Sequence, residues 1–150
     1  MGSTIKASSK YGYPEGSEKV YNKEGQIEKV VLPNGDHDFY EGECLVRTEF
    51  PDGVIRFYNK LGYMDRLLFP DGRERFFDKE GKLHRVGGPA IIYSDGREDY
   101  FVHGKRHRED GPAIVYPGKF YLDDEQVDPK EVEARYLANR KKSALSRGNE

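Results

Sequence analysis

The first half of the chain repeats a short phrase at nearly constant spacing. Pro-x-Gly occurs four times, and successive copies are 19, 18 and 19 residues apart. An apolar pair follows every copy at the same sequence offset. The four pairs are Val20 with Tyr21, Phe39 with Tyr40, Phe57 with Tyr58, and Phe76 with Phe77. Self-similarity at a fixed period is the signature of a repeat architecture, in which one supersecondary unit recurs along the chain.

Each repeat unit contains two turns separated by short runs. Proline fixes φ at the first central position of a turn, and glycine adopts a positive φ later in it. A second glycine lies nine residues after the first in three of the four units, and Gly42 replaces it in the second unit. The runs between turns have five to nine residues and are rich in Val, Ile, Tyr and Phe, which is typical of strands. We therefore predict an antiparallel meander of β-hairpins, with about two strands per unit.

A second, different repeat follows. Residues 83–104 are echoed by residues 106–124, and the His-Arg pair that opens the first copy, His84-Arg85, recurs 23 residues later as His107-Arg108. In the first copy Val86-Gly87 stands where the Glu-Asp of the second copy stands. We expect a strand, a turn and a strand in each copy.

The pattern changes after Asp128. Pro129 occupies a favourable first helical position, and acidic residues come early and basic residues late, which suits the helix dipole. We predict a helix over residues 129–143 that caps the open end of the sheet, as the terminal elements of repeat arrays do.

The predicted organisation has four parts. A disordered N-terminus covers residues 1–12, and the hairpin-repeat sheet covers residues 13–127. The C-terminal capping helix covers residues 128–145, and a tail covers residues 146–150.

Alternation along the predicted strands leaves neither face of the sheet cleanly apolar. Ile55 and Phe57 point to one side, and Arg56 and Tyr58 point to the other. A β-sandwich needs one strongly hydrophobic face on each strand. We therefore predict an all-β repeat fold, an extended and largely single-layer open sheet with one C-terminal helix. The alternative is a sheet coiled into a partial barrel that the helix plugs.

Repetition keeps the aromatic side chains in register across such a sheet. Each cross-strand aromatic pair contributes about 0.2–1 kcal/mol, and an arginine over an exposed ring contributes about 0.5–1 kcal/mol. Exposed aromatic rings on a sheet with two solvent-facing sides indicate a surface that binds a partner. The candidate partner-binding face consists of Tyr21, Tyr40, Tyr58, Phe77, Arg56 and Arg75.

The composition indicates a folded chain with a thin core. The 150 residues suggest one domain by length, and only 35% of them are hydrophobic while 35% are charged. The 11 Tyr and 8 Phe are far more than a disordered chain contains. The formal net charge of -2 gives no electrostatic reason to bind nucleic acid or an anionic membrane.

Three resemblances rest on these motifs. The units with glycine turns and aromatic pairs resemble MORN-type hairpin repeats, including the MORN-like variants of bacterial antitoxin-annotated proteins. Residues 83–132 resemble the Leu-His-Arg-Glu-Asp-Gly-Pro-Ala repeat proteins of large DNA viruses and phages, although Asp124 stands where those repeats have glycine. The Pro-Asp-Gly half is similar, more weakly, to the centriolar G-box, an open β-sheet that binds proline-rich peptides. The resemblances imply a fold and a binding role, and no substrate.

The residue pattern predicts no enzyme, no catalytic residue, no cofactor and no metal site. His84, His103, His107 and Asp110 do not have the spacing of a zinc site, and we expect the histidines to hydrogen-bond neighbouring turns. The recurrent carboxylates fall at turns, where turn chemistry accounts for them.

The single Cys44 rules out an intramolecular disulfide and fits a reducing compartment. No stretch is long and apolar enough to cross a membrane, and the start of the chain lacks the apolar region of a signal peptide. We expect a cytoplasmic, intracellular location.

The favoured function is a non-enzymatic protein-interaction module that presents aromatic ladders and sheet edges to a protein or an extended peptide. The family resemblances add a narrower version, a viral or phage host-factor inhibitor or an antitoxin-like protein. Unpaired edges also suggest an edge-to-edge homodimer. The alternative is a nucleic-acid or phospholipid binder that uses a row of arginines, Arg56, Arg66 and Arg75, and the basic end of the helix at residues 140–147. The near-neutral charge makes both partners unfavourable.

Overall fold

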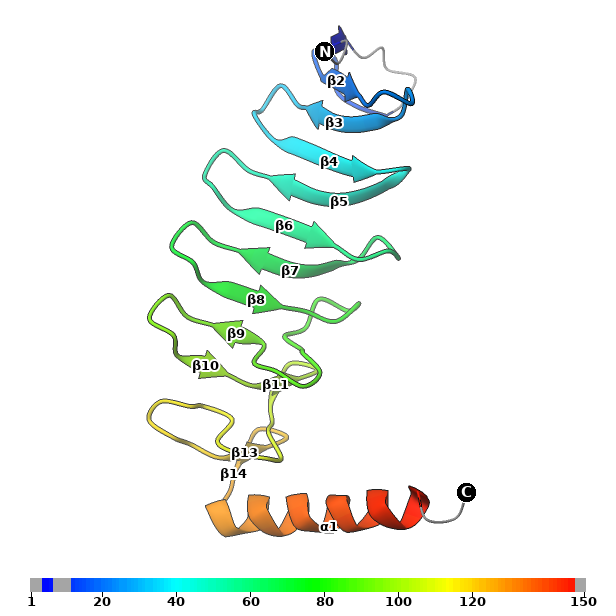
Figure 1. Ribbon diagram of the computed structural model, residues 1–150. Coiled ribbons are helices and arrows are strands. Elements are labelled where there is room, and N and C mark those ends of the chain that lie inside the picture. The colour runs from blue at the N-terminus through cyan, green and yellow to red at the C-terminus, as the bar shows by residue number, and fades with distance from the viewer. Residues whose placement is uncertain (1–3, 7–11, 148–150) are drawn as a thin grey trace. The chain divides into compact units, whose positions relative to one another are not determined.

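The computed structural model describes residues 4–6 and 12–147, and Figure 1 shows the arrangement of its strands and helix. The chain divides into two compact units, residues 1–74 and residues 75–150. The division falls inside the predicted hairpin-repeat segment, residues 13–127. We describe the two units separately, as unit 1 and unit 2.

Unit 1 is an antiparallel meander in which each strand pairs with the next strand along the chain. Its strands are β1 (Thr4–Lys6), β2 (Glu18–Tyr21), β3 (Ile27–Val31), β4 (His37–Glu41), β5 (Cys44–Glu49), β6 (Ile55–Tyr58) and β7 (Met64–Leu68), and β8 (Glu74–Phe76) begins at its last residue. The strand order is linear, and the first strand does not pair with the last. The predicted open antiparallel sheet is therefore confirmed, and the alternative of a partial barrel is wrong.

The Pro-x-Gly turns have the geometry that the sequence requires. In the turn between β3 and β4, the Gly35 amide donates to the Leu32 carbonyl at 3.0 Å, and the Leu32 amide donates to the Asp36 carbonyl at 2.9 Å. Gly35 has φ +90°, the left-handed conformation that closes a three-residue hairpin loop after a type I turn. The same pair of backbone hydrogen bonds recurs at the turns beginning with Phe50 and Phe69.

Successive Pro-x-Gly turns of unit 1 also pack against one another. A Cβ added at Gly53 would lie 2.9 Å from Cγ of Pro70, and one added at Gly35 would lie 3.0 Å from Cγ of Pro51. Glycine is thus required at these positions for two reasons: it adopts the positive φ, and it leaves space for the proline of the next turn. The repeated phrase positions each turn on the following one.

Asx side chains hold the turns in both units. Asp52 Oδ1 accepts the amide of Val54 at 3.0 Å, and Asn59 Oδ1 accepts the amide of Leu61 at 2.9 Å. An Asp or Asn side chain that bonds the backbone two residues on stabilises a turn locally. The recurrent carboxylates at Asp71, Asp78 and Asp95 accept backbone amides in the same way.

Unit 2 is built from short strand pairs and ends in the helix. Its strands after β8 are β9 (Ile91–Ile92), β10 (Glu98–Asp99), β11 (Phe101–Val102), β12 (Lys105–Arg106), β13 (Tyr121–Leu122) and β14 (Glu125–Gln126). They pair antiparallel as β9 with β10, β11 with β12, and β13 with β14. The Ala90 amide donates to the Asp99 carbonyl at 2.9 Å, and the Tyr100 amide donates to the Ala113 carbonyl at 2.7 Å.

The apolar core is thin in both units. Among the described residues of unit 1, the buried ones are Val30 and the polar residues Ser17, Lys19 and Thr48. In unit 2, the buried hydrophobic residues are Ala90, Ile91, Ala113, Leu122 and Val132. Most other strand residues are half-buried, as a sheet with little covering its faces requires.

Helix α1 (Pro129–Arg147) confirms the single C-terminal helix. Asp128 caps it, because its Oδ1 accepts the Lys130 amide at 2.9 Å. Val132 is 2% exposed and anchors the first turns, and Asn139 donates to Glu109 Oε2 at 2.8 Å. The helix runs four residues beyond the predicted end at residue 143, because the sequence offers no proline or glycine after Pro129 until Gly148.

The predicted disordered N-terminus, residues 1–12, includes β1, which pairs with β2. Residues 1–3 and 7–11 lie outside the described residues, as do residues 148–150 of the predicted tail. In the described part of the chain, no helix is both long enough and apolar enough to cross a membrane.

Candidate functional site

One face of unit 1 carries a ladder of alternating rings and cations, which we call the cation face. Strand register places Lys29, Phe39, Arg47, Phe57 and Arg66 directly opposite one another on β3 to β7. The Arg47 guanidinium lies 3.7 Å from the Phe39 ring centre, the Lys29 Nζ lies 5.2 Å from it, and the Arg66 guanidinium lies 4.7 Å from the Phe57 ring centre. The protein's own cations therefore cover the two rings of this face.

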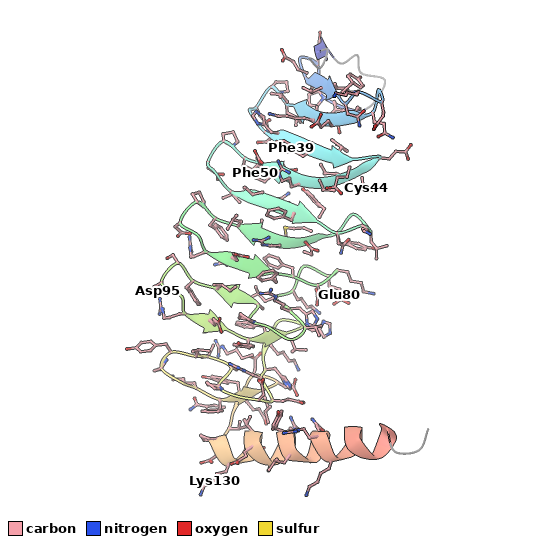
Figure 2. The ribbon with its side chains drawn as sticks, viewed as in Figure 1. Phe39, Cys44, Phe50, Glu80, Asp95 and Lys130 are labelled. Atoms are coloured by element: carbon pink, nitrogen blue, oxygen red, sulfur yellow. The ribbon has the colours of Figure 1, made fainter. Side chains whose placement is uncertain are left out.

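Carboxylates complete the cation face. Arg47 Nε pairs with Glu49 Oε1, and Arg66 Nε pairs with Glu74 Oε2, both at 2.8 Å. Figure 2 labels Phe39 on β4, which is the first aromatic residue of this ladder. Each of these two arginines therefore has both a ring and a carboxylate as partners.

The opposite face of unit 1 carries four of the six predicted site residues, and we call it the phenol face. Side chains alternate along a strand, so Tyr40 and Tyr58 point away from the cation face that Phe39 and Phe57 occupy. Arg56 shares this face, because it lies two residues from Tyr58. Tyr21 on β2 belongs to it by the same alternation.

One β-bulge lies next to each tyrosine of the phenol face. The register shifts between Val20 and Tyr21, between Phe39 and Tyr40, and between Phe57 and Tyr58. A bulge bends the strand locally and re-aims a side chain. The recurrence of one irregularity at one repeat position gives the three phenols equivalent settings.

Tyr40 is at the centre of the phenol face. Burial and then the neighbouring Tyr58 hydroxyl raise the pKa of Tyr40 above its ordinary value. The Tyr40 hydroxyl also hydrogen-bonds the hydroxyl of Tyr13, whose ring lies 5.3 Å from Lys19 Nζ. The sequence interpretation missed Tyr13, although a signal existed. The residue before each Pro-x-Gly is apolar in every unit: Tyr13, Leu32, Phe50 and Phe69.

The phenol face differs from the cation face in how its rings are covered. In the described part of the chain, no cation lies over Tyr21, Tyr40 or Tyr58. The Arg56 guanidinium lies instead 5.0 Å from the ring centre of Phe50, the residue labelled in Figure 2 at the turn after β5. The Arg56 Nε is buried and has no hydrogen-bond partner among the described residues. The phenols therefore offer ring surface that the protein's own charges do not occupy.

The other two predicted site residues, Phe77 and Arg75, belong to unit 2. Phe77 forms an isolated antiparallel bridge with Leu83, and Arg75 is exposed on β8. The structure thus brings together four of the six residues on one face. The binding role of all six stays a prediction.

Unit 2 contains the two copies of the second sequence repeat, residues 83–104 and 106–124, and an arginine of each copy lies over an aromatic ring. The guanidinium of Arg85 lies 3.9 Å from the Phe76 ring centre, and that of Arg108 lies 3.9 Å from the Tyr100 ring centre. A groove of about 430 Å³ runs along these arginines. The groove is lined by Arg85, Gly87, Gly88, Tyr100, Phe101, Val102, His107, Arg108, Glu109, Asp110 and Tyr136.

The repeated histidines bind neighbouring turns, as the sequence predicted. His84 Nδ1 accepts the His103 amide, and His107 Nδ1 accepts the Asp123 amide, both at 3.3 Å. The His84 and His103 rings stack with their centres 4.2 Å apart. Both acceptor nitrogens face turns whose first residue has a positive φ, so the histidines support strained turn positions.

Asp78 ties the same region together. Its Oδ2 accepts the Nδ1–H of His103 at 2.7 Å, and its Oδ1 accepts the Glu80 and Lys82 amides. The hydrogen bond from His103 is the main cause that lowers the pKa of Asp78 to about 2. Within residues 4–6 and 12–147, no group of three or more His, Cys, Asp or Glu side chains is arranged to hold a metal ion.

Comparison with known proteins gives two solved structures of similar fold. One is the G-box domain of the microcephaly protein CPAP, with TM-score 0.41 and 19% identity, covering 68% of this chain and 64% of that one. The other is the TCP10 domain of Danio rerio CPAP in complex with a peptide of Danio rerio STIL, with TM-score 0.39 and 21% identity, covering 65% of this chain and 58% of that one. No family model and no curated protein matches the chain.

These two structures agree with the weaker resemblance, the one to the centriolar G-box. This chain spans less than two thirds of each of the two matched chains. At these identities and TM-scores the similarity concerns the sheet alone and carries no argument about what this chain binds. The resemblances to MORN-type repeats and to the viral and phage repeat proteins stay predictions.

Proposed function

We propose that this protein is a non-enzymatic interaction module that binds an extended, proline-rich segment of a partner protein across the phenol face of unit 1. The observation that supports it is the contrast between the two faces. The Phe39 and Phe57 rings are covered by the protein's own cations, whereas no cation of the described part of the chain covers the three phenols.

The spacing of the phenols suits a polyproline II segment. Tyr21, Tyr40 and Tyr58 lie on β2, β4 and β6, so each is two strands from the next. Strands lie about 4.8 Å apart, which separates the rings by about 9.5 Å. A polyproline II helix repeats every three residues, or about 9.3 Å. A segment that runs across the strands would present every third residue to successive phenols.

Energetics favour such a ligand as well. A polyproline II segment is already extended before binding and loses little conformational entropy, and aromatic grooves recognise it by ring contacts. A tyrosine hydroxyl can also donate to the backbone carbonyls of such a segment, which lacks amide protons at proline.

We place the module in a reducing, cytoplasmic setting, consistent with its one cysteine. Cys44 is free and exposed at the start of β5. A host-factor inhibitor or an antitoxin-like role is a narrower version of this proposal, which rests on the viral and phage resemblance. Association of two copies through sheet edges is a further prediction.

The test uses a labelled ten-residue peptide with proline at every third position and fluorescence anisotropy. The wild type and the Tyr63→Ala variant should bind alike, because Tyr63 is a tyrosine of unit 1 that lies in the turn after β6. The Tyr40→Ala/Tyr58→Ala variant should bind at least tenfold more weakly while it keeps a β-type circular dichroism spectrum. Equal binding by all three proteins would contradict the proposed face.

The alternative, a nucleic-acid or phospholipid binder, has one supporting observation. Arg140, Lys141 and Lys142 are exposed along the second half of α1. Against it, Arg66 of the predicted arginine row is paired with Glu74. Binding to single-stranded DNA or to phosphatidylserine vesicles that falls steeply with salt, and that Arg140→Gln/Lys141→Gln/Lys142→Gln abolishes, would favour this alternative.

A further inference from the structure

In unit 2, the two copies of the second repeat hold their arginines by the same set of contacts, which we call the arginine frame. Arg85 and Arg108 each lie 3.9 Å from an aromatic ring centre. Arg85 Nη1 donates to the Pro89 carbonyl at 3.5 Å, and Arg108 Nη1 donates to the Pro112 carbonyl at 3.4 Å. The guanidinium and the proline carbonyl thus recur after 23 residues, and an aromatic ring beneath the guanidinium recurs after 24.

Glycines complete the frame in both copies. A Cβ added at Gly88 would lie 3.3 Å from Nε of Arg85, and one added at Gly111 would lie 3.1 Å from Nε of Arg108. Neither glycine has a positive φ, so close approach is the reason for glycine at these positions. The backbone therefore passes directly along the guanidinium in each copy.

The copies differ in what neutralises the arginine. Arg108 Nε donates to Asp110 Oδ1 at 2.7 Å. Gly87 occupies the position equivalent to Asp110, and Val86 occupies the position equivalent to Glu109. Among the described residues, no carboxylate pairs with Arg85. The first copy keeps the arginine frame and lacks its acid.

The same substitution opens the groove at Arg85. Gly87 has φ +71°, a left-handed conformation that Asp110 does not share, so the backbone takes a different path here. The Val86 side chain is 86% exposed at this point. The groove of about 430 Å³ passes Arg85, Gly87 and Gly88 and continues to Phe101 and Val102. That volume lies within the range of ligand pockets.

We propose that this groove binds an acidic peptide segment of a partner protein. Arg85 holds the carboxylate of an Asp or Glu side chain, in the position that Asp110 takes on Arg108. An apolar neighbour of that acid packs against Phe101 and Val102, which line the same groove. This site is in unit 2 and is independent of the phenol face of unit 1.

Charge favours a carboxylate over a phosphate in this groove. Glu109 and Asp110 line it, and both are already held, Glu109 by Asn139 and Asp110 by Arg108. A single negative charge neutralises Arg85, whereas a doubly charged phosphate would face two fixed carboxylates without a second free cation of the groove to match it. The second copy shows that the frame accommodates one planar carboxylate.

The test is a titration followed by ¹⁵N–¹H NMR on the full chain. The probes are acetyl-Leu-Asp-Gly-Val-amide and its matched control, acetyl-Leu-Asn-Gly-Val-amide. The Asp peptide should shift the Gly87 and Gly88 amides and bind at least tenfold tighter than the Asn peptide. Equal affinity of the two peptides would overturn the proposed carboxylate recognition.

Two variants assign the effect to Arg85. Arg85→Gln should remove the tenfold preference for the Asp peptide. Arg97→Gln is the matched control and should keep it, because Arg97 also lies over a ring, 5.0 Å from its centre, yet pairs with an acid and does not line the groove. A preference that survives Arg85→Gln would overturn the assignment.

A gain-of-binding variant covers the case in which Arg85→Gln does not fold. Asp110→Gly imitates the first copy and frees Arg108, so binding of the Asp peptide should strengthen at least threefold. No change in affinity would contradict the equivalence of the two frames. Inorganic phosphate provides the remaining comparison. If it shifts Gly87 and Gly88 at lower concentration than the Asp peptide does, the site is a phosphate site and the proposal is wrong.

Discussion

The stacked turns of unit 1 make a graded prediction about glycine. Gly62, Gly16, Gly35 and Gly53 have similar φ, between +80° and +90°. They differ in the space beside them. A Cβ at Gly62 would meet nothing within 4 Å, whereas the nearest proline Cγ would be 3.5 Å away at Gly16, 3.0 Å at Gly35 and 2.9 Å at Gly53. Replacement by alanine should therefore cost progressively more in this order.

The magnitude follows from two separable effects. A left-handed conformation costs a non-glycine residue about 1–2 kcal/mol, and the stiffer unfolded chain returns about 0.4–1 kcal/mol. Gly62→Ala should thus lower the free energy of unfolding by about 1 kcal/mol. Gly53→Ala adds a contact that forces Pro70 to move, and overpacking of this kind costs about 1–3 kcal/mol more. We expect a total of about 2–4 kcal/mol at Gly53.

The assay is urea denaturation of the four alanine variants at one pH, followed by tyrosine fluorescence and circular dichroism. Coincident transitions would establish two-state behaviour before free energies are compared. A double-mutant cycle isolates the contact, because Pro70→Ala removes the Cγ atom that the new methyl group of Gly53→Ala would meet. The added cost at Gly53 should then fall towards that at Gly62. Equal destabilisation at Gly53 and Gly62 would refute turn stacking as the reason for the repeat.

Three further predictions follow from individual contacts. Asp78→Asn should destabilise the protein at pH 7 but progressively less as the pH falls. The pKa of Asp78 is lowered from 3.8 to about 2, so its carboxylate stabilises the fold above pH 3.8 and loses that contribution as the pH drops through about 2. Urea midpoints of both proteins at pH 7, 4 and 2 measure the difference, and a difference that is undiminished at pH 2 would contradict this prediction. A double-mutant cycle of Phe39→Leu and Arg47→Ala should give a coupling of about 0.5–1 kcal/mol in urea unfolding, since the guanidinium lies 3.7 Å from the ring centre; zero coupling would show that the stacked pair contributes nothing. Val132→Ala should cost about 1–3 kcal/mol and speed amide exchange in the first turns of α1, because Val132 is the buried anchor of that helix; unchanged exchange would mean that the helix is held elsewhere.

The strands of unit 1 were predictable because their determinants are local. Pro-x-Gly and the second glycine set the turns by their own backbone preferences, and the runs between them are too short for helices. The paired turn bonds at Leu32, Phe50 and Phe69 show that the repeated phrase specifies one turn geometry. The fold class followed from these signals alone.

The assignment of residues to faces needed the register. Alternation predicted that Arg56 and Tyr58 share a face, and the structure agrees. It could not show that Lys29, Arg47 and Arg66 cover the rings of the other face, because cross-strand partners depend on where each hairpin closes. The contact of Tyr13 with Tyr40 depends on the register too, since it spans 27 residues.

Two features of the second half of the chain could not be predicted from the sequence. The division between the units falls after Glu74, inside a stretch where the repeat continues, so no composition change marks it. The groove at Arg85 depends on tertiary contacts between two copies of a repeat. Its sequence signal was the departure of Val86-Gly87 from the Glu-Asp pattern, which gains meaning once Arg108 is seen paired with Asp110.

The most direct test of the proposed function is quantitative capture of a protein partner from cell lysate, measured by mass spectrometry with three baits. The baits are the wild type, the Tyr63→Ala control and the Tyr40→Ala/Tyr58→Ala variant. We expect one proline-rich protein that the first two baits retain equally and the third loses, with all three baits folded. Equal retention by the folded double variant would contradict binding at the phenol face.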